Sequence, residues 1–402
     1  MGARASWAML FCALLALHGC GGSGNDGNSN SGANSNPGTQ QNNTDTNTGG
    51  DTNTGGDTNT GGDSDTGGNP GNGSGCNASI SRCFDLAKTR VTRYRDNKQA
   101  AASYTFDDGY ESSFNIAKIF EDLNLRATFY IVTGNVTDNA WPRWQALAAK
   151  GHEIGNHSMT HEVDMSLPQT DAVLNTEIVD SKHLIEQKLG PGPMTFAFPW
   201  HAYTQHALDI ASQNHVAVRK LSLPNEPYEF AFFDRADHET GAEDAPPVPE
   251  DQVLARVNGQ LDRMVQAGGW FVAGGHGLDG DGWSPVSSQF LKDHLKHAGN
   301  YASKLWIDTF LNVTRYRMCR SQVTPKVDIL SSEKALVSLS TAADPDLCTE
   351  PLTVAMPITG LSSEKIRVRD EAGKDLPVNC DNGTLLLNLR PGQKMKVEIL
   401  QP

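Results

Sequence analysis

From about residue 100, short apolar runs alternate with segments in which apolar residues recur at helical spacing. The apolar runs predict buried strands at 101–106, 127–132, 195–198, 216–218 and 270–273, with a further strand leading into Asn156. The helical periods lie between them, at 116–123, 144–149, 174–185, 207–211 and 253–265. Strands that alternate with helices imply parallel strands joined by crossovers, so we predict an α/β sheet or barrel.

The pattern changes near residue 321. Short candidate strands follow one another at 327–330, 335–339, 352–355, 366–368, 385–389 and 395–400. Asn382-Gly383 and Pro391-Gly392 supply turns. We therefore predict a small all-β sandwich domain over residues 321–402, appended to an α/β domain over residues 76–320.

The N-terminus has the pattern of an export signal. A single early positive charge precedes the apolar stretch Trp7–Leu17, which is too short to span a bilayer. Residues 17–20 then resemble a bacterial lipobox, in which Cys20 would be lipidated. We expect a lipoprotein signal peptide over 1–19 and a membrane-anchored, exported protein. Gly21 after the cysteine suggests the outer membrane. The alternative is an ordinary signal peptide with Cys20 incidental.

Residues 20–75 consist almost wholly of Gly, Asn, Ser, Thr and Asp, with a repeated Asp-Thr-Asn-Thr-Gly-Gly hexamer. Such a segment has almost nothing apolar to bury, so we predict a disordered tether with a reach of about 40 Å. The net charge of −14 argues against a nucleic-acid partner.

Export places the cysteines where disulfides persist. We favour the local pairs Cys76–Cys83 and Cys348–Cys380, which leave Cys319 over, although connectivity cannot be settled from sequence. No Cys-x-x-Cys pair suggests a thiolate metal site.

Three polar clusters fall at predicted strand ends, where reactive residues of α/β folds gather. They are Thr105-Phe106-Asp107-Asp108-Gly109, then His157-Ser158-Met159-Thr160-His161, and finally Gly274-Gly275-His276-Gly277. Two histidines four apart lie on one face if the strand gives way to a helical turn, and with one carboxylate they can grip an ion. Taken singly, each cluster also has a structural explanation that involves no function: an Asp-Gly turn, surface histidines, or a solvated loop histidine.

The order and spacing of the clusters resemble the polysaccharide deacetylase family, also called the NodB-homology domain or carbohydrate esterase family 4. The TFDDG motif stands at 105–109 and the HSxxH motif at 157–161, and His276 falls where the last histidine motif is expected. The resemblance covers roughly residues 95–320 and implies a distorted (β/α) barrel.

The resemblance also implies roles for these residues. Asp108, His157 and His161 would hold one divalent metal, zinc by preference, with cobalt, nickel or iron as alternatives. Asp107 would be the catalytic base and His276 the general acid. Backbone N–H groups near Gly109 and Tyr110 would stabilise the oxyanion together with the metal. We also expect Tyr110 to bind the substrate.

The chain departs from the family pattern in two places. Its third motif is Phe196-Ala197-Phe198-Pro199-Trp200, so Ala197 stands where an arginine is common. Pro199 and Trp200 match, and Trp200 either walls the sugar pocket or belongs to the core. Arg219 or Arg235 could supply the missing charge. The family's Asp-and-Trp motif has no clean match, and Asp234 or Asp237 is the nearest candidate.

We therefore expect a metal-dependent hydrolase that removes N- or O-linked acetyl groups from a polysaccharide such as xylan, chitin or peptidoglycan. The alternative is a carbohydrate-binding member of the fold with weak or no catalysis, which the missing arginine suggests. The small β domain shows no surface row of aromatics, so we expect it to give structural support.

Overall fold

The computed structural model describes residues 76, 78–224, 226–238, 246–340, 344–345 and 347–401. The predicted signal peptide, Cys20 and the tether over 20–75 lie outside the described residues. None of the described helices combines the length and the apolar character that crossing a bilayer requires.

The centre of the fold is a parallel sheet, which confirms the predicted α/β class. Its strand order is β6-β5-β4-β3-β2-β8-β7, with β9 also paired to β2. The strands are β2 (Ala100–Phe106), β3 (Thr128–Ile131), β4 (Glu153–Asn156), β5 (Thr195–Ala197), β6 (Ala217–Arg219), β7 (Tyr228–Phe232), β8 (Trp270–Gly275) and β9 (Leu305–Ile307). Within the described ranges β6 and β7 do not pair with each other, so the sheet curls into a half-barrel and stays open.

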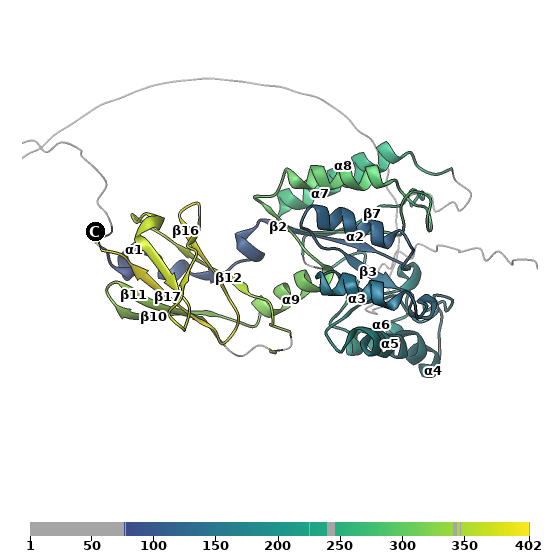
Figure 1. Cartoon of the computed structure of the whole chain (residues 1–402), viewed down its shortest axis with the longest axis horizontal. Helices are drawn as coiled ribbons and strands as arrows, with labels where there is room; N and C mark the ends of the chain where they lie inside the picture. Colours follow the sequence, from purple (N-terminus) through teal and green to yellow (C-terminus); the bar gives the residue numbers. More distant parts are fainter. Residues whose placement is uncertain are drawn as a thin grey trace, which may run out of the picture. The chain divides into compact units, whose positions relative to one another are not determined.

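Helices connect these strands and cover the sheet (Figure 1). They are α2 (Ser113–Asp122), α3 (Trp141–Ala149), α4 (Asp171–Leu174), α5 (Ser181–Leu189), α6 (Gln205–Asn214), α7 (Glu250–Ala267), α8 (Ser288–Gly299) and α9 (Phe310–Arg320). The helices α7 and α8 pack side by side. Strand β2 is buried along its whole length, as expected for a parallel strand covered on both faces.

One predicted helix differs in its interior. The helix expected over 174–185 is interrupted between α4 and α5 by a π-helical segment, η4 (Asn175–Asp180). π-helical turns inside α-helices are rare and frequently occur at functional sites. The apolar period could not reveal this segment, because one extra residue per turn changes the spacing only locally.

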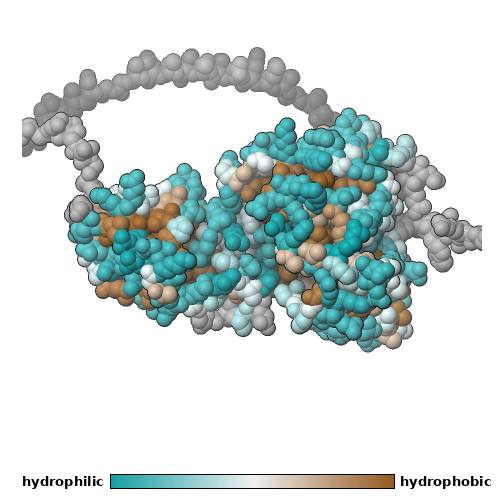
Figure 2. Space-filling model, in the orientation of Figure 1, coloured by the Kyte–Doolittle hydropathy of each residue, from teal (hydrophilic) through white to brown (hydrophobic). Residues whose placement is uncertain are grey.

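The C-terminal part is all β, as predicted. Two antiparallel sheets have the orders β1-β12-β16-β15, where β1 is Arg90–Val91, and β10-β11-β17-β13-β14. Their strands are β10 (Pro325–Ser331), β11 (Lys334–Leu339), β12 (Leu352–Pro357), β13 (Ile366–Arg369), β14 (Asp375–Leu376), β15 (Asn379–Asp381), β16 (Thr384–Leu389) and β17 (Lys394–Ile399). On the face drawn in Figure 2, apolar side chains lie in separate patches between hydrophilic ones.

Residues before the barrel also belong to this β part. Helix α1 (Ile80–Cys83) lies in the same hydrophobic cluster as the strands of the two sheets, and β1 (Arg90–Val91) pairs with β12. The sequence-based boundary placed these residues in the catalytic domain. Their pairing and burial instead place them with the C-terminal sheets, which no local pattern could indicate.

The disulfide between Cys76 and Cys83 is confirmed. The predicted pair Cys348–Cys380 is wrong, because Cys348 bonds to Cys319 and Cys380 has a free thiol. The last turn of α9 brings the Cα of Cys319 to 5.4 Å from that of Cys348, within the range that a disulfide requires. Proximity along the chain was therefore a poor guide to this bond.

Candidate metal centre and active site

The two adjacent carboxylates of the first cluster follow β2 at the C-terminal edge of the sheet. The backbone N–H of Asp107 donates to the Gly275 carbonyl and so extends the ladder between β2 and β8. Asp108 then turns the chain with a φ of 71°, a value that non-glycine residues rarely adopt. Because of this reversal, the two side chains differ in solvent exposure: Asp107 is buried and Asp108 is half-buried.

The second cluster reaches the same edge from β4, but its local structure differs from the prediction. Residues 157–161 form an irregular loop and not a helical turn. Ser158 and His161 have φ values of 73° and 60°, and the Ser158 hydroxyl accepts a hydrogen bond from the His161 N–H. The reversals in this loop, rather than helical periodicity, bring the two rings to a centroid distance of 5.0 Å.

Asp108, His157 and His161 converge on one point. The Asp108 Oδ1 atom lies 3.4 Å from His157 Nε2 and 3.6 Å from His161 Nε2. One ligand atom from each of the three residues lies within 4.8 Å of the others. His157 Nδ1 donates to the Ala197 carbonyl at 2.8 Å, so in the neutral ring Nε2, which faces Asp108, is the nitrogen available to bind a metal.

The donor set fits a divalent metal. Asp108 Oδ1 is buried without a hydrogen-bond partner in the described part of the chain, and such an orphaned atom is costly unless something positive meets it. Two imidazoles and one carboxylate leave open positions for water, as in catalytic zinc sites. These three residues could therefore hold the ion.

Asp107 forms a buried ion pair that the third sequence motif did not indicate. Arg219 donates from Nη1 to Asp107 Oδ1 at 2.7 Å and from Nη2 to Oδ2 at 2.6 Å. Nη1 also donates to the Thr105 hydroxyl at 2.8 Å. Burial alone would raise the pKa of Asp107, but the Arg219 guanidinium outweighs it and holds this pKa well below its ordinary range. Asp107 is therefore ionised at neutral pH.

Arg219 stands beside the position where the family motif carries its arginine. Strands β5 and β6 pair in parallel, with Ala197 opposite Arg219 in the register. Arg219 is thus the residue that supplies the charge that Ala197 lacks. Arg235, the other candidate, instead donates from Nε to the Val248 carbonyl.

His276 follows β8 and is half-buried beside Trp283, with ring centroids 4.8 Å apart. Its buried Nδ1 has no hydrogen-bond partner among the described residues. Of the two acids expected to tune this histidine, Asp234 pairs through Oδ1 with His238 Nε2 at 2.6 Å, and the role of Asp234 or Asp237 toward His276 stays a prediction.

The remaining predicted site residues surround the metal cluster. Trp200 packs on His161, with ring centroids 4.6 Å apart, and is half-buried, so it lies at the site and not in the core. Pro199 is buried and begins the turn η5 (Pro199–His201), which contains Trp200. Burial, followed by the Asp108 carboxylate, raises the pKa of Tyr110 to about 12, so its hydroxyl stays protonated.

A buried glutamate on the π-helical segment holds the loop of metal-binding histidines. The Glu177 carboxylate accepts hydrogen bonds from the N–H groups of Met159 and Thr160 and from the Thr160 hydroxyl, at 3.1, 2.9 and 2.8 Å. Asn156 accepts from the Ser158 N–H at 3.0 Å. Sequence reasoning missed Glu177, and the only available signal was a glutamate inside an apolar helical period.

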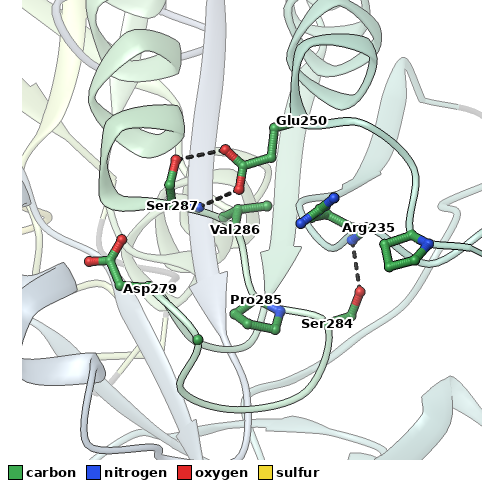
Figure 3. A pocket seen from close by; sticks show the side chains of 9 residues that line it. Arg235, Glu250, Asp279, Ser284, Pro285, Val286 and Ser287 are labelled. Carbon is green, nitrogen blue, oxygen red and sulfur yellow. Dashed lines mark hydrogen bonds between the residues drawn. The ribbon is translucent and has the colours of Figure 1, made fainter.

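A cavity of about 240 Å³ lies near the end of β8 and does not include the metal cluster (Figure 3). Its lining comes from the loops before α7 and α8, namely Arg235, Pro247, Glu250, Asp279, Gly280, Ser284, Pro285, Val286 and Ser287. Glu250 and Asp279 hydrogen bond to serines at the start of α8. The carboxylates of this cavity are thus already engaged within the protein.

Residues 94–218 match the family model described as polysaccharide deacetylase. The chain is 25% identical over 309 residues to a gellan lyase from Bacillus sp, covering 71% of this chain and 12% of that protein. It is 30% identical over 99 residues to a peptidoglycan-N-acetylglucosamine deacetylase from Bacillus cereus, covering 24% of this chain and 45% of that protein. The chain thus spans less than half of the length of these curated relatives.

Among solved structures, the chain is similar to a Mycobacterium smegmatis protein described as a polysaccharide deacetylase. The TM-score is 0.46 at 16% identity, and the alignment covers 58% of this chain and 94% of that one.

Proposed function

Because the chain contains a polysaccharide deacetylase domain of the NodB-homology type, carbohydrate esterase family 4, we propose that it is a metal-dependent hydrolase that removes acetyl groups from a polysaccharide and releases acetate. The observation that carries this proposal is the convergence of Asp108, His157 and His161 beside the ion-paired Asp107.

Asp108, His157 and His161 would hold the ion, and zinc is our first choice, with cobalt, nickel or iron as alternatives. A divalent ion at this position supplies Lewis acidity toward a water molecule and toward the acetyl carbonyl. Imidazole and carboxylate donors suit all four metals, so the donor set supports the class of ion and leaves its identity to experiment.

The chain's own residues would carry the proton transfers. Asp107, kept ionised by Arg219, accepts a proton from the attacking water. His276 donates a proton to the departing sugar nitrogen or oxygen. Backbone N–H groups near Gly109 and Tyr110 stabilise the negative charge that develops on the carbonyl oxygen. The products are acetate and a free amine or hydroxyl on the glycan.

The substrate would be an acetylated polysaccharide such as xylan, chitin or peptidoglycan. Trp200, half-buried against His161, offers an aromatic surface at the metal cluster for a sugar ring. Pro199 and Tyr110 would complete this wall. Turnover on chitin oligomers or peptidoglycan as against acetylated xylan distinguishes an N-acetyl from an O-acetyl substrate.

We further propose that the protein is exported and lipid-anchored through Cys20. The lipobox-like segment and the polar tether support this proposal. Cells that express the protein would show a membrane-bound, fatty-acid-labelled form, and Cys20→Ser would remove the label. An unlabelled, freely released wild-type protein would contradict the anchor.

The enzyme assay uses purified, zinc-loaded protein and measures acetate release from acetylated xylan, chitin oligomers and peptidoglycan. We expect turnover on at least one of them. Asp107→Asn should lower the rate by about 10²–10⁴-fold, the usual contribution of a positioned base, with zinc stoichiometry retained. If none of the three substrates released acetate, we would favour the alternative, a carbohydrate-binding protein with weak or no catalysis. The ion pair between Arg219 and Asp107 supports catalysis over this alternative, which the missing motif arginine had suggested.

A further inference from the structure

The loop between β8 and α8, residues 276–287, is held by hydrogen bonds where it joins α8. We call it the His276 loop. Next to α8, the Ser287 N–H and hydroxyl donate to the Glu250 carboxylate, each at 2.7 Å (Figure 3). The Ser288 N–H and hydroxyl donate to the Asp279 carboxylate, again each at 2.7 Å. These bonds fix where the loop enters α8 and tie Asp279, within the loop, to the first turn of that helix.

The middle of the His276 loop is fixed as well. Ser112 donates its N–H to Asp281 Oδ2 at 2.7 Å, and the Arg235 N–H donates to the Ser284 hydroxyl at 2.9 Å (Figure 3). A Cβ atom added at Gly277 would lie 1.9 Å from the Asp281 carbonyl oxygen, so only glycine fits there. The loop is therefore packed against itself and against the turn that follows β2.

This arrangement includes unfavourable backbone conformations. Asp279 and Ser284 have φ values of 56° and 44°, in the left-handed region. Such residues persist where surrounding contacts over-determine them, and they gather at functional sites. The contacts of the preceding paragraphs supply that constraint, so the loop holds its tip in one place.

The side chain at this tip is Trp283, which is 50% exposed. Among the large apolar side chains exposed in the described residues, it is the one aromatic ring; the others are Leu123, Leu167, Leu221, Met318, Ile329 and Leu330. Its ring stands edge-on to His276 at 74° and 4.8 Å between centroids. A rigid loop thus presents an open indole beside the proposed acid.

We propose that Trp283 is a specificity-determining residue that receives the apolar face of a sugar ring and so brings the leaving atom to His276. An exposed indole combines a large apolar area with few rotatable bonds, so it can bind a pyranose ring at little entropic cost. This inference rests on the proposed deacetylase function and deepens it, because it assigns the substrate to glycans with a sugar ring beyond the acetyl group.

The test compares two substrates. Acetylated xylo-oligosaccharides or N-acetylglucosamine oligomers present sugar rings, whereas 4-nitrophenyl acetate presents none. We expect Trp283→Ala to lower the ratio of kcat/KM for the oligosaccharide to that for 4-nitrophenyl acetate by 10–100-fold, mainly through KM. Trp283→Phe, which keeps an aromatic face, should recover most of the ratio. Leu123→Ala, a change at another exposed apolar residue, should leave it unchanged.

A second measurement does not depend on turnover. Titration of the wild-type protein with the deacetylated oligosaccharide should quench tryptophan fluorescence, and Trp283→Ala should weaken that binding by a similar factor. Equal losses on both substrates, or unchanged binding, would overturn the stacking role. A wild-type enzyme that releases no acetate from any substrate would instead refute the deacetylase proposal, and the binding titration would still decide the role of Trp283.

Discussion

The guanidinium of Arg219 donates two parallel hydrogen bonds to the carboxylate of Asp107, across a buried edge of the sheet. The arginine comes from β6, one strand beyond the position where the family's third motif carries it, and Ala197 is its partner in the register. Arg219 therefore provides, from a neighbouring strand, the positive charge that the third motif of this chain lacks.

Removing the Arg219 guanidinium should impair both catalysis and stability. In Arg219→Ala the Asp107 carboxylate loses its partner and its orientation, and we expect kcat to fall by about 10²-fold or more. Breaking one side of a buried ion pair also costs about 3–5 kcal/mol of unfolding free energy. Steady-state kinetics and urea unfolding measure the two effects. A variant that keeps wild-type kcat would show that the pair has no role in the reaction.

The register predicts a rescue of that variant. In the double variant Arg219→Ala, Ala197→Arg, the new arginine starts from the neighbouring position on β5 and can reach the same carboxylate. We expect kcat to recover by at least tenfold over Arg219→Ala, while Ala197→Lys in the same background recovers less because an ammonium cannot make the bidentate contact. If both double variants stay as inactive as Arg219→Ala, the position opposite Arg219 is not equivalent to it.

Metal removal should abolish turnover and lower stability. Dialysis against a chelator would remove the ion from the three-residue cluster, and zinc or cobalt should restore acetate release. At a zinc concentration of 100 times Kd, binding would stabilise the fold by about 2.7 kcal/mol, visible as a higher Tm. This shift should vanish in His161→Ala and persist in His183→Ala, a change at an exposed histidine of α5. A zinc-dependent Tm that survives both changes would place the ion elsewhere.

Glu177 should act on the metal through the loop that it holds. Loss of its three hydrogen bonds in Glu177→Ala frees residues 159 and 160 next to His161, and such supporting contacts are worth about 10–100-fold in metal affinity. We expect weaker zinc binding and an altered visible spectrum of the cobalt form. Glu177→Gln, which can still accept from the backbone, should recover most of the affinity.

The matched control for Glu177 is Glu186→Ala on α5, where the side chain pairs with Lys182. This variant should retain wild-type zinc affinity and the same cobalt spectrum. If Glu177→Ala changed only the unfolding free energy and left both metal readouts untouched, its role would be structural alone.

A buried histidine makes stability depend on pH. Burial lowers the pKa of His294 to about 3, and the ring is held neutral between the Tyr104 hydroxyl and the Asn258 side chain. Above pH 6.5 the ring is neutral in both the folded and the unfolded chain. As pH falls from 6.5 toward 3, only the unfolded chain takes up the proton, so the unfolding free energy decreases by up to about 1.4 kcal/mol per pH unit.

Urea unfolding between pH 7 and pH 4 measures this effect. His294→Gln should lose stability less steeply than the wild type over that range, whereas His183→Gln, at an exposed position, should follow the wild-type curve. Parallel curves for wild type and His294→Gln would refute the assignment.

The sequence by itself determined the strands that supply the site and most of its polar residues. Apolar runs marked β2, β4, β5 and β8 because a parallel strand is buried on both faces. Their C-terminal ends carry Asp107, Asp108, His157 and His276, and motif order along the chain was sufficient to find them. The all-β character of the C-terminal part followed from the same kind of local pattern.

Only the tertiary structure decided which distant residues meet. Four contacts join segments that are separated along the chain. They are the ion pair of Arg219 with Asp107, the hydrogen bonds of Glu177 to the histidine loop, the disulfide between Cys319 and Cys348, and the pairing of β1 with the C-terminal sheets. Periodicity reports the environment of one segment at a time, whereas these contacts depend on strand order and register. They therefore become visible only when the sheet is assembled.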